Sequence, residues 1–275
     1  MHTIAQLLQQ GSERLKDIDN PLLEARLLLA YVLKVEPVWL MTWPEKEVSE
    51  NDNALYQQFL ERRVQREPLA YLLGSKEFWS LSFKVNNAVL VPRPETELLV
   101  ETVIAELPDE PLTLVELGTG SGAIACALAH TRPRWKIMAT DISSEALAVA
   151  KENAQTLRLS NIEWFQANWF AGLTLSKVAA IVSNPPYLSK TDPHLVNELL
   201  HEPKQALVSG ESGLEAYQVI IANAYEHLLE GGLLALEHGY EQAASISQLL
   251  EKRGYGQVKT LADLAGLPRV TLAKK

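Results

Sequence analysis

The spacing of hydrophobic residues changes twice along the chain and divides it into three stretches. Up to about residue 73 the apolar positions recur at helical spacing, and a broad apolar face follows Asn20-Pro21, a typical helix start. Gly74 follows this stretch and provides a glycine stop. We therefore predict a small N-terminal helical domain over residues 1–74.

The second stretch, residues 75–92, has the pattern of β-strands. Apolar residues between Phe78 and Val85 precede Asn86-Asn87, and the apolar run 88–91 follows. Because asparagine tolerates positive φ, these residues predict a turn between two strands. We expect a β-hairpin that links the helical domain to the rest of the chain.

In the third stretch, residues 93–275, a first helix ends near residue 106, and apolar runs then alternate with helices. The predicted strands are 113–117, 136–140, 161–166, 178–183, 232–237 and 270–273. The predicted helices are 123–130, 144–157, 213–229 and 240–253. This alternation predicts an α/β domain with a mainly parallel sheet covered by helices on both faces.

Composition and charge exclude several classes of protein. The chain is 47% apolar and 21% charged, which indicates a globular rather than a disordered protein. It has neither a run of about 18 apolar residues nor a signal peptide, so we expect a cytoplasmic protein without membrane association. Cys126 is the single cysteine and the histidines lack metal-ligand spacing, so no metal site is predicted. The net charge of −9, with scattered Lys and Arg, disfavours direct binding of duplex nucleic acid.

A glycine-rich segment follows the first strand of the α/β domain and precedes a helix. Its glycines allow a tight turn and a close approach of the backbone to a ligand at the helix N-terminus. Asp141 ends the next strand roughly 20 residues later, as expected of a carboxylate that accepts hydrogen bonds from ribose hydroxyls. The pattern predicts a nucleoside-cofactor site made of Glu116, Gly118, Thr119, Gly120, Ser121, Gly122 and Asp141.

Glu116 distinguishes two kinds of nucleoside cofactor. The segment also satisfies a loose dinucleotide pattern, so a nicotinamide enzyme is one alternative. A carboxylate just before the glycines would repel a pyrophosphate, however, whereas S-adenosyl-L-methionine carries ammonium and sulfonium charges and no phosphate. We therefore expect S-adenosyl-L-methionine as the cofactor.

A rigid polar segment, Asn184-Pro185-Pro186-Tyr187, comes directly after the strand at 178–183. Neither proline has an N–H group with which to continue a sheet ladder. The side-chain oxygen of Asn184 and the carbonyl of Pro185 provide two hydrogen-bond acceptors beside the aromatic face of Tyr187. This arrangement suits a planar NH₂ group, whose nitrogen it would orient and enrich as positive charge develops. A simple strand-ending turn is the alternative for this segment alone.

These motifs resemble known enzymes in their order along the chain. Residues 116–122, Asp141 and residues 184–187 resemble class I S-adenosylmethionine-dependent methyltransferases that act on nitrogen. Other segments resemble the release-factor glutamine methyltransferases of the HemK/PrmC family, and they extend the resemblance to nearly the whole chain: residues 66–74, Phe78-Trp79, residues 91–97, Asn168-Trp169-Phe170 and Leu236-Glu237-His238-Gly239.

The resemblance implies the Rossmann-like fold of class I methyltransferases and a specific reaction, N5-methylation of the glutamine in the Gly-Gly-Gln motif of class I peptide-chain release factors. It implies that residues 118–122 and Asp141 hold the cofactor and that Trp169 packs at its adenine. It also implies that Asn184 contacts both cofactor and substrate, and that Pro185, Pro186 and Tyr187 complete a glutamine pocket. Asn184, Pro185 and Tyr187 are the expected catalytic residues.

Other functions remain open from the sequence. One is glutamine methylation of a ribosomal protein. Another is N6-methylation of adenine in nucleic acid, since a flipped adenine also presents a planar NH₂, although this function predicts a basic recognition region that the sequence lacks. A third is a cofactor-binding interaction protein that has lost activity; Asn168, where the family commonly has Asp, favours it mildly, and the intact segment 184–187 counts against it. We interpret the helical domain as a docking platform for a protein substrate.

Overall fold

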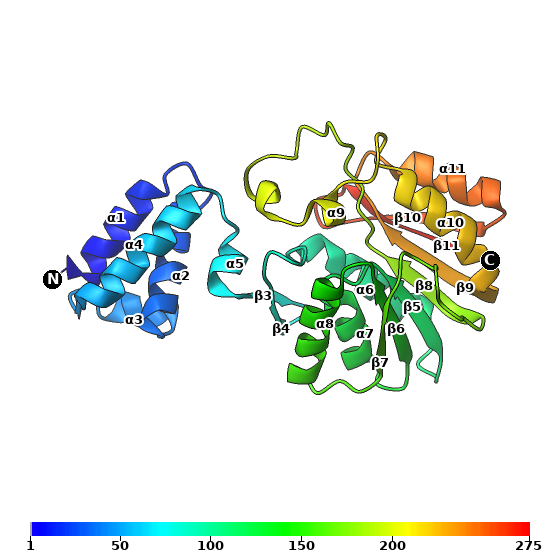
Figure 1. The fold of residues 1–275 in the computed structure, drawn as a ribbon, viewed down its shortest axis with the longest axis horizontal. Helices are drawn as coiled ribbons and strands as arrows, with labels where there is room; N and C mark the ends of the chain where they lie inside the picture. Colours follow the sequence, from blue (N-terminus) through cyan, green and yellow to red (C-terminus); the bar gives the residue numbers. More distant parts are fainter. Residues whose placement is uncertain (1) are drawn as a thin grey trace. The chain divides into compact units, whose positions relative to one another are not determined.

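Short helices form the first of two compact units in the computed structural model, which describes residues 2–275 (Figure 1). The chain divides after Ser75. The helices of the first unit are α1 (Ile4–Arg14), α2 (Pro21–Leu33), α3 (Pro37–Thr42), α4 (Glu50–Val64) and α5 (Leu69–Leu73). Two short antiparallel strands, β1 (His2–Thr3) and β2 (Glu47–Val48), accompany them.

The first unit follows the helical pattern of its sequence. Asn20 adopts φ 56° immediately before Pro21 starts α2, and Gly74 ends α5 with φ 71°. Both helix boundaries therefore confirm the sequence prediction. The apolar faces of α1, α2 and α4 enclose a common core, in which the buried hydroxyl of Tyr56 donates to the carbonyl of Ala25 at 3.2 Å.

The predicted hairpin exists, but its turn lies earlier than expected. Strands β3 (Ser75–Phe78) and β4 (Leu81–Lys84) pair across Trp79 and Ser80, whose φ angles are 55° and 57°. Two successive residues with positive φ match the twist of the flanking strands in a two-residue hairpin. Glu97 stabilises the turn by accepting the backbone N–H of Trp79 at 2.7 Å.

A turn does form at Asn86-Asn87, where the backbone N–H of Val89 donates to the carbonyl of Asn86 at 3.1 Å, but it joins no strands, and the predicted strand at 88–91 is wrong. Residues 88–91 form a loop whose valines, Val89 and Val91, are buried by packing rather than by strand pairing. The backbone N–H of Val91 donates to Oε2 of Glu202 at 2.9 Å, so a distant carboxylate takes the place of a ladder partner.

The second unit is built on a seven-stranded sheet in the order β10-β11-β9-β8-β5-β6-β7. The strands from β9 to β7 are parallel, and β11 runs antiparallel to both β9 and β10. The strands are β5 (Thr113–Leu117), β6 (Lys136–Asp141), β7 (Ile162–Gln166), β8 (Val178–Ser183), β9 (Leu228–Glu237), β10 (Gly256–Ala262) and β11 (Pro268–Lys274).

Helices cover the sheet and complete the predicted α/β architecture. The longer helices are α6 (Glu97–Glu106), α7 (Ala123–Thr131), α8 (Ser144–Thr156), α10 (Glu215–His227) and α11 (Ala243–Arg253). Shorter turns are η1 (Pro94–Thr96), η2 (Asn197–His201) and α9 (Lys204–Leu207). The six predicted strands and five predicted helices of this unit are present, whereas β10 was not predicted and β9 begins at Leu228 instead of residue 232.

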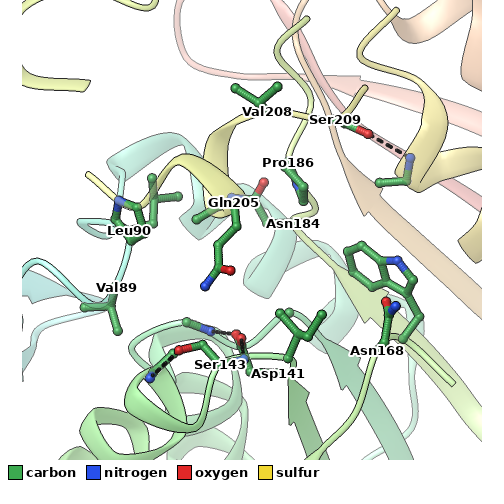
Figure 2. A pocket seen from close by; sticks show the side chains of 18 of the residues that line it. Val89, Leu90, Asp141, Ser143, Asn168, Asn184, Pro186, Gln205, Val208 and Ser209 are labelled. Atoms are coloured by element: carbon green, nitrogen blue, oxygen red, sulfur yellow. Dashed lines mark hydrogen bonds between the residues drawn. The ribbon is translucent and has the colours of Figure 1, made fainter. Parts of the chain in front are cut away.

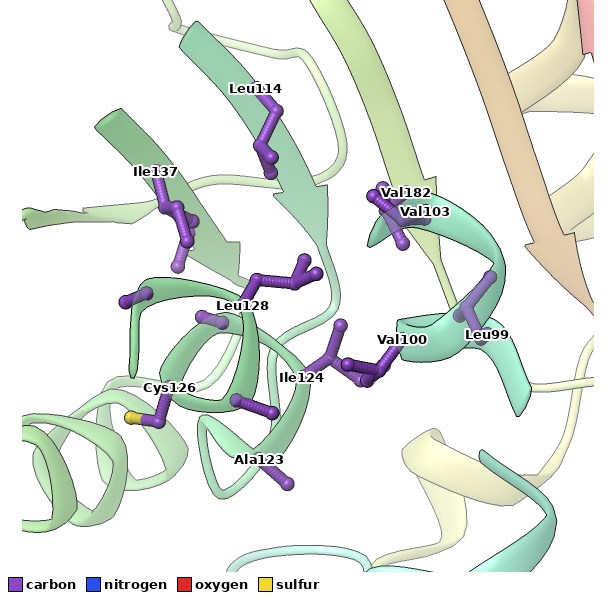
Figure 3. Close-up of a cluster of buried hydrophobic side chains, with 14 of the residues drawn as sticks. Leu99, Val100, Val103, Leu114, Ala123, Ile124, Cys126, Leu128, Ile137 and Val182 are labelled. Atoms are coloured by element: carbon purple, nitrogen blue, oxygen red, sulfur yellow. The ribbon is translucent and has the colours of Figure 1, made fainter. Parts of the chain in front are cut away.

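Both faces of the sheet are buried, which explains the continuous apolar runs of its parallel strands. On one face, Leu114 and Ile137 pack with α6, α7 and the hairpin, as Figure 3 shows for the cluster around Leu128. On the other face, Leu234 packs with α10 and α11, where Tyr217 is fully buried. In the part of the chain that the structure describes, no helix is both long and apolar enough to span a bilayer.

The strand order places the predicted motifs at one edge. After β5 the chain adds β6 and β7 on one side and then returns to β8 on the other. The loops that follow β5 and β8 therefore diverge, and ligands of open α/β sheets bind in the crevice at such a switch point. The glycine-rich segment, Asp141 and residues 184–187 all follow the carboxyl ends of these neighbouring strands.

Candidate active site

Three left-handed glycines shape the loop between β5 and α7. The φ angles are 72° for Gly118, 56° for Gly120 and 80° for Gly122, a region that side chains other than glycine rarely adopt. A Cβ on Gly122 would lie 3.0 Å from that of Ala150 in α8, so this glycine also permits close packing of the two helices. The backbone N–H of Thr119 donates to the carbonyl of Thr140 at 2.8 Å and fixes the loop against β6.

Asp141 holds the same loop from the end of β6. Its Oδ2 accepts the backbone N–H of Gly120 at 2.9 Å, and its Oδ1 accepts that of Ser143 at 2.9 Å. Burial raises the pKa of this carboxyl, and the N–H bonds from Ser143 and Gly120 oppose the shift. The carboxylate is therefore held at a fixed position between the glycine loop and α8.

A cavity of about 390 Å³ lies in front of these groups, within the size range of small-ligand pockets. Figure 2 shows Asp141 and Asn168 at one side and Asn184 and Pro186 at another, with Gln205 of α9 pointing into the space between them. The predicted site residues that line it are Gly118, Gly120, Asp141, Trp169, Asn184 and Pro186.

Trp169 occupies an unusual backbone conformation beside the glycine loop. Its φ is 54°, which costs a non-glycine residue conformational energy. A Cβ on Gly118 would lie 3.6 Å from Cζ3 of its indole ring, so the ring closely approaches the loop. The indole is thereby presented to the cavity as an aromatic wall.

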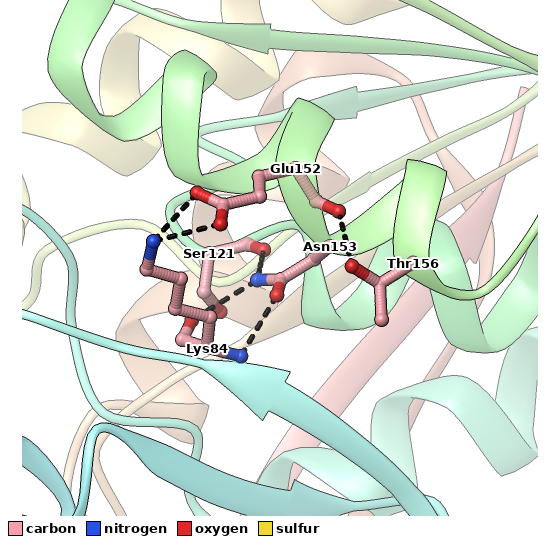
Figure 4. A network of polar contacts seen from close by, with 5 residues as sticks. All are labelled: Lys84, Ser121, Glu152, Asn153 and Thr156. Carbon is pink, nitrogen blue, oxygen red and sulfur yellow. Dashed lines mark hydrogen bonds and ion pairs between the residues drawn. The ribbon is translucent and has the colours of Figure 1, made fainter.

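The remaining predicted cofactor residues do not line this cavity: Glu116, Thr119, Ser121 and Gly122. Glu116 is fully buried, its Oε2 accepts the hydroxyl of Thr119 at 2.7 Å, and its Oε1 has no hydrogen-bond partner. Burial raises the pKa of Glu116 to about 7. The carbonyl of Ser121 accepts the side-chain amide of Asn153 at 2.9 Å (Figure 4).

A second cavity, of about 430 Å³, adjoins the first. Asn184, Leu90 and Ala206 line both cavities. Tyr187 lines the second cavity, whereas Pro185 is buried and lines neither. Asn184 therefore lies where the two cavities meet.

The segment 184–187 is held on each side. The hydroxyl of Ser183 donates to the carbonyl of Leu117 at 2.7 Å and ties the end of β8 to β5. The side-chain Nδ2 of Asn184 donates to the hydroxyl oxygen of Thr96 at 3.3 Å, and the carbonyl of Tyr187 accepts Nε2 of Gln242 at 2.9 Å. Burial raises the pKa of the Tyr187 phenol, which favours its neutral form.

Known proteins resemble this chain over both of its units. Residues 6–74 match the model of the PrmC N-terminal domain, and residues 94–213 match that of the methyltransferase small domain. The release factor glutamine methyltransferase of Coxiella burnetii is 43% identical over 277 residues, which cover 100% of each chain. That of Escherichia coli strain K12 is 39% identical over 268 residues, 97% of each chain. This chain belongs to the release factor glutamine methyltransferase family.

Solved structures agree with the class I methyltransferase fold. A methyltransferase of Pyrococcus furiosus has a TM-score of 0.54 at 20% identity and covers 72% of this chain and 90% of its own. The 16S rRNA N2 G1207 methyltransferase of Thermus thermophilus, solved in complex with AdoMet and guanosine, also has a TM-score of 0.54, at 18% identity over 73% of this chain and 49% of its own. The family resemblance, the fold and the methyltransferase activity predicted from the sequence are thus confirmed.

Two charged residues of this methyltransferase site, Glu237 and Arg269, were not singled out from the sequence as site residues. The second cavity is also lined by Arg93, Glu237 and Arg269. Arg93 forms an ion pair with the buried carboxylate of Glu202, which ties this wall of the cavity to a residue over a hundred positions along the chain. The only sequence signal was that Arg93 and Glu237 fall inside segments shared with the family. Among residues 2–275 no group of three or more His, Cys, Asp or Glu is arranged to hold a metal ion.

Proposed function

We propose that this enzyme transfers the methyl group of S-adenosyl-L-methionine to N5 of the glutamine in the Gly-Gly-Gln motif of class I peptide-chain release factors. The observation that carries the proposal is the place of Asn184 at the junction of two cavities, because one residue can there contact both a methyl donor and an amide. Release factors act in translation, so the proposed reaction takes place in the cytoplasm.

The chemistry of the first cavity fits S-adenosyl-L-methionine. Its carboxylate, Asp141, suits ribose hydroxyls, and the indole of Trp169 suits an adenine face. Gly118 and Gly120 leave room for a close approach of the backbone. The buried Oε1 of Glu116, which lacks a partner, adds a negative field that favours a cationic ligand and disfavours a pyrophosphate. When bound, this cofactor supplies an electrophilic methyl group on a sulfonium.

The loop residues shape this pocket from behind. Thr119 donates a hydrogen bond to one oxygen of Glu116, and Ser121 and Gly122 fix the start of α7. We assign them to cofactor binding through the shape of the loop. Asn168, which lines the cavity beside Trp169, retains a side-chain oxygen that can accept a hydrogen bond from an adenine amino group.

In the second cavity the substrate amide is held by two acceptors. Because Nδ2 of Asn184 donates to Thr96, its Oδ1 is left to accept one N–H of the glutamine side chain. We assign the other N–H to the backbone carbonyl of the adjacent Pro185, although that residue lines neither cavity. Tyr187 closes the second cavity around the planar amide, and Pro186 closes the first. These bonds strengthen as positive charge develops on nitrogen, and alignment of the lone pair lowers the barrier further. The aromatic face of Tyr187 also tolerates the cationic methyl group.

No strong general base is needed in this mechanism. An amide nitrogen that has accepted a methyl group carries positive charge and is strongly acidic, so its proton passes to water after transfer. The acceptors on Asn184 and Pro185 favour this order, since they bind the cationic nitrogen more strongly than the neutral amide.

We assign residues 1–74 to docking of the release factor, residues 75–92 to a linking segment with the hairpin, and residues 93–275 to catalysis. A protein substrate accounts for the added helical unit, which a free amide would not require. The match of residues 6–74 to the PrmC N-terminal domain supports the boundary of this unit.

Labelled-methyl transfer tests the proposed substrate. The purified enzyme is incubated with labelled S-adenosyl-L-methionine and a class I release factor, beside the same factor with its Gly-Gly-Gln glutamine changed to alanine. A ribosomal-protein mixture and duplex DNA serve as competing substrates. We expect label only on the release factor that retains its Gly-Gly-Gln glutamine. Label on DNA or ribosomal protein, with none on the release factor, would overturn the proposal.

A further inference from the structure

The strand register brings a buried carboxylate beside the substrate-binding asparagine. Ser183, the last residue of β8, pairs with Leu236 of β9. The next residues along these parallel strands are Asn184 and Glu237, which therefore lie at neighbouring strand ends. Glu237 is 2% exposed and lines the second cavity, and its Oε2 has no hydrogen-bond partner.

Thr96 connects these two side chains from the end of η1. Its hydroxyl oxygen accepts Nδ2 of Asn184 at 3.3 Å. Burial raises the pKa of Glu237, and the nearby side chains of Thr96 and Asn184 counter part of that shift, which places both beside its carboxylate. A hydroxyl can accept from one neighbour and donate to another, so Thr96 can transmit the orientation of the carboxylate to the amide.

Charged groups of both signs surround Glu237. Arg269 of β11 favours its ionised form, and Glu95 of η1 opposes it. The phenol of Tyr187 faces it from the segment after β8, with Arg93 also acting on that phenol. The backbone is fixed as well, because the hydroxyl of Tyr217 in α10 donates to the Glu237 carbonyl at 2.8 Å. His238 instead pairs its Nε2 with the hydroxyl of Thr271 at 2.8 Å.

We propose that Glu237 is a positioning residue, which acts through Thr96 to hold the Asn184 amide with Nδ2 turned inward and Oδ1 turned toward the substrate. The proposal rests on the methyl-transfer function given above. An ionised carboxylate has no proton to donate, so the Thr96 hydroxyl donates to it and keeps its own oxygen free for Nδ2 of Asn184. The amide is thereby prevented from flipping.

Protonation of Glu237 disrupts these hydrogen-bond directions. Its carboxyl then donates a hydrogen bond, which competes for the Thr96 oxygen or for Oδ1 of Asn184. Burial raises the pKa of Glu237 to about 7. The ionised, ordering form is therefore lost as the pH falls through about 7, and turnover at saturating cofactor falls with it.

Paired variants at Thr96 and Glu237 test this relay by kinetics against the release factor. Glu237→Gln keeps the shape but adds a donor, and we expect kcat to fall at least about tenfold while the cofactor Kd stays within about threefold. Thr96→Val should match that loss, and Thr96→Ser, which keeps the hydroxyl, should stay near wild type. The double variant Thr96→Val/Glu237→Gln should be no worse than either single one, because both break one chain of contacts.

The pH dependence separates positioning from a merely structural role. The kcat of the wild-type enzyme should fall on the acid side of about pH 7, and this acid limb should be absent in Glu237→Gln. The pKa of Glu116 is also about 7, so saturating cofactor is used to keep its effect on cofactor binding out of this measurement. Wild-type kcat in Glu237→Gln, an unchanged acid limb, or additive losses in the double variant would overturn the proposal.

A spectroscopic readout keeps the relay distinguishable from the substrate assignment. The side-chain amide proton signals of Asn184 should shift with pH near 7 in wild type and by clearly less in Thr96→Val. If the enzyme leaves the release factor unmethylated but this titration is present, only the function fails. If the enzyme methylates the release factor and the signals do not titrate, only the relay fails. Should Glu237→Gln not fold, Thr96→Val against Thr96→Ser decides by the same measurements.

Discussion

Alanine at Gly122 introduces two separate costs at the start of α7. The residue has φ 80°, where an L side chain is strained by about 1–2 kcal/mol. The added Cβ would also lie 3.0 Å from the Cβ and 3.2 Å from the Cα of Ala150. Backbone atoms of α8 cannot yield as a flexible side chain can, and overpacking of this kind costs about 1–3 kcal/mol. The sum is a loss of about 2–5 kcal/mol in the free energy of unfolding.

Gly120 provides the matched control within the same loop. Its φ is 56° and no heavy atom lies within 4 Å of the position that an added Cβ would take, so Gly120→Ala carries the strain alone, about 1–2 kcal/mol. Urea unfolding without cofactor, followed by circular dichroism, measures both variants. The structure requires that Gly122→Ala lose more stability than Gly120→Ala. Equal losses would refute the close packing of α7 against α8 as the reason for this glycine.

Two further predictions concern buried polar groups around the loop. The pKa of Glu116 is about 7 in the fold and about 4.5 when unfolded, so its contribution to stability is full below pH 4.5 and is lost as the pH rises through 7. Glu116→Gln should therefore flatten the pH dependence of urea unfolding, and an unchanged slope would contradict this. Asn153→Ala removes bonds to Ser121 and to both backbone groups of Lys84 (Figure 4), and should cost about 2–3 kcal/mol and weaken cofactor binding in calorimetry. Glu152→Ala breaks only the exposed ion pair with Lys84 and should cost less than about 1 kcal/mol; equal losses would remove the assigned role of Asn153.

Much of the fold was predictable because parallel strands buried on both faces leave a strong signal. The run 178–183 has one polar residue, Ser183, and the run 113–117 has only Thr113 and Glu116; the bounds of both runs agree with β8 and β5. The chemistry was predictable for a related reason: glycines, Asp141 and Asn184 follow strands that end at one edge of the sheet.

The features that were missed depend on pairing or on distant residues. Strand β10 lies at the sheet edge and is largely exposed, so its sequence lacks an apolar alternation. The hairpin turn at Trp79 and Ser80 contains no glycine or asparagine, and it depends on the contact with Glu97, which lies outside the hairpin. Glu237 reaches Asn184 only through the register of β8 with β9.

The complete burial of Glu116 could not be predicted from its sequence motif. The motif correctly places a carboxylate beside the glycine loop, but packing beneath the loop buries it completely. Its hydrogen bond from Thr119 is a local contact, three residues along the chain, whereas its desolvation depends on the whole sheet. Burial, rather than residue identity, raises its pKa.

Site-resolved mass spectrometry of a release factor treated with this enzyme tests the central claim most directly. Wild-type enzyme with S-adenosyl-L-methionine should add one methyl group to the glutamine of the Gly-Gly-Gln peptide. Asn184→Ala should slow that addition by at least about a hundredfold while cofactor affinity stays within about tenfold. A methyl group on another residue, or full wild-type turnover in Asn184→Ala, would contradict the account.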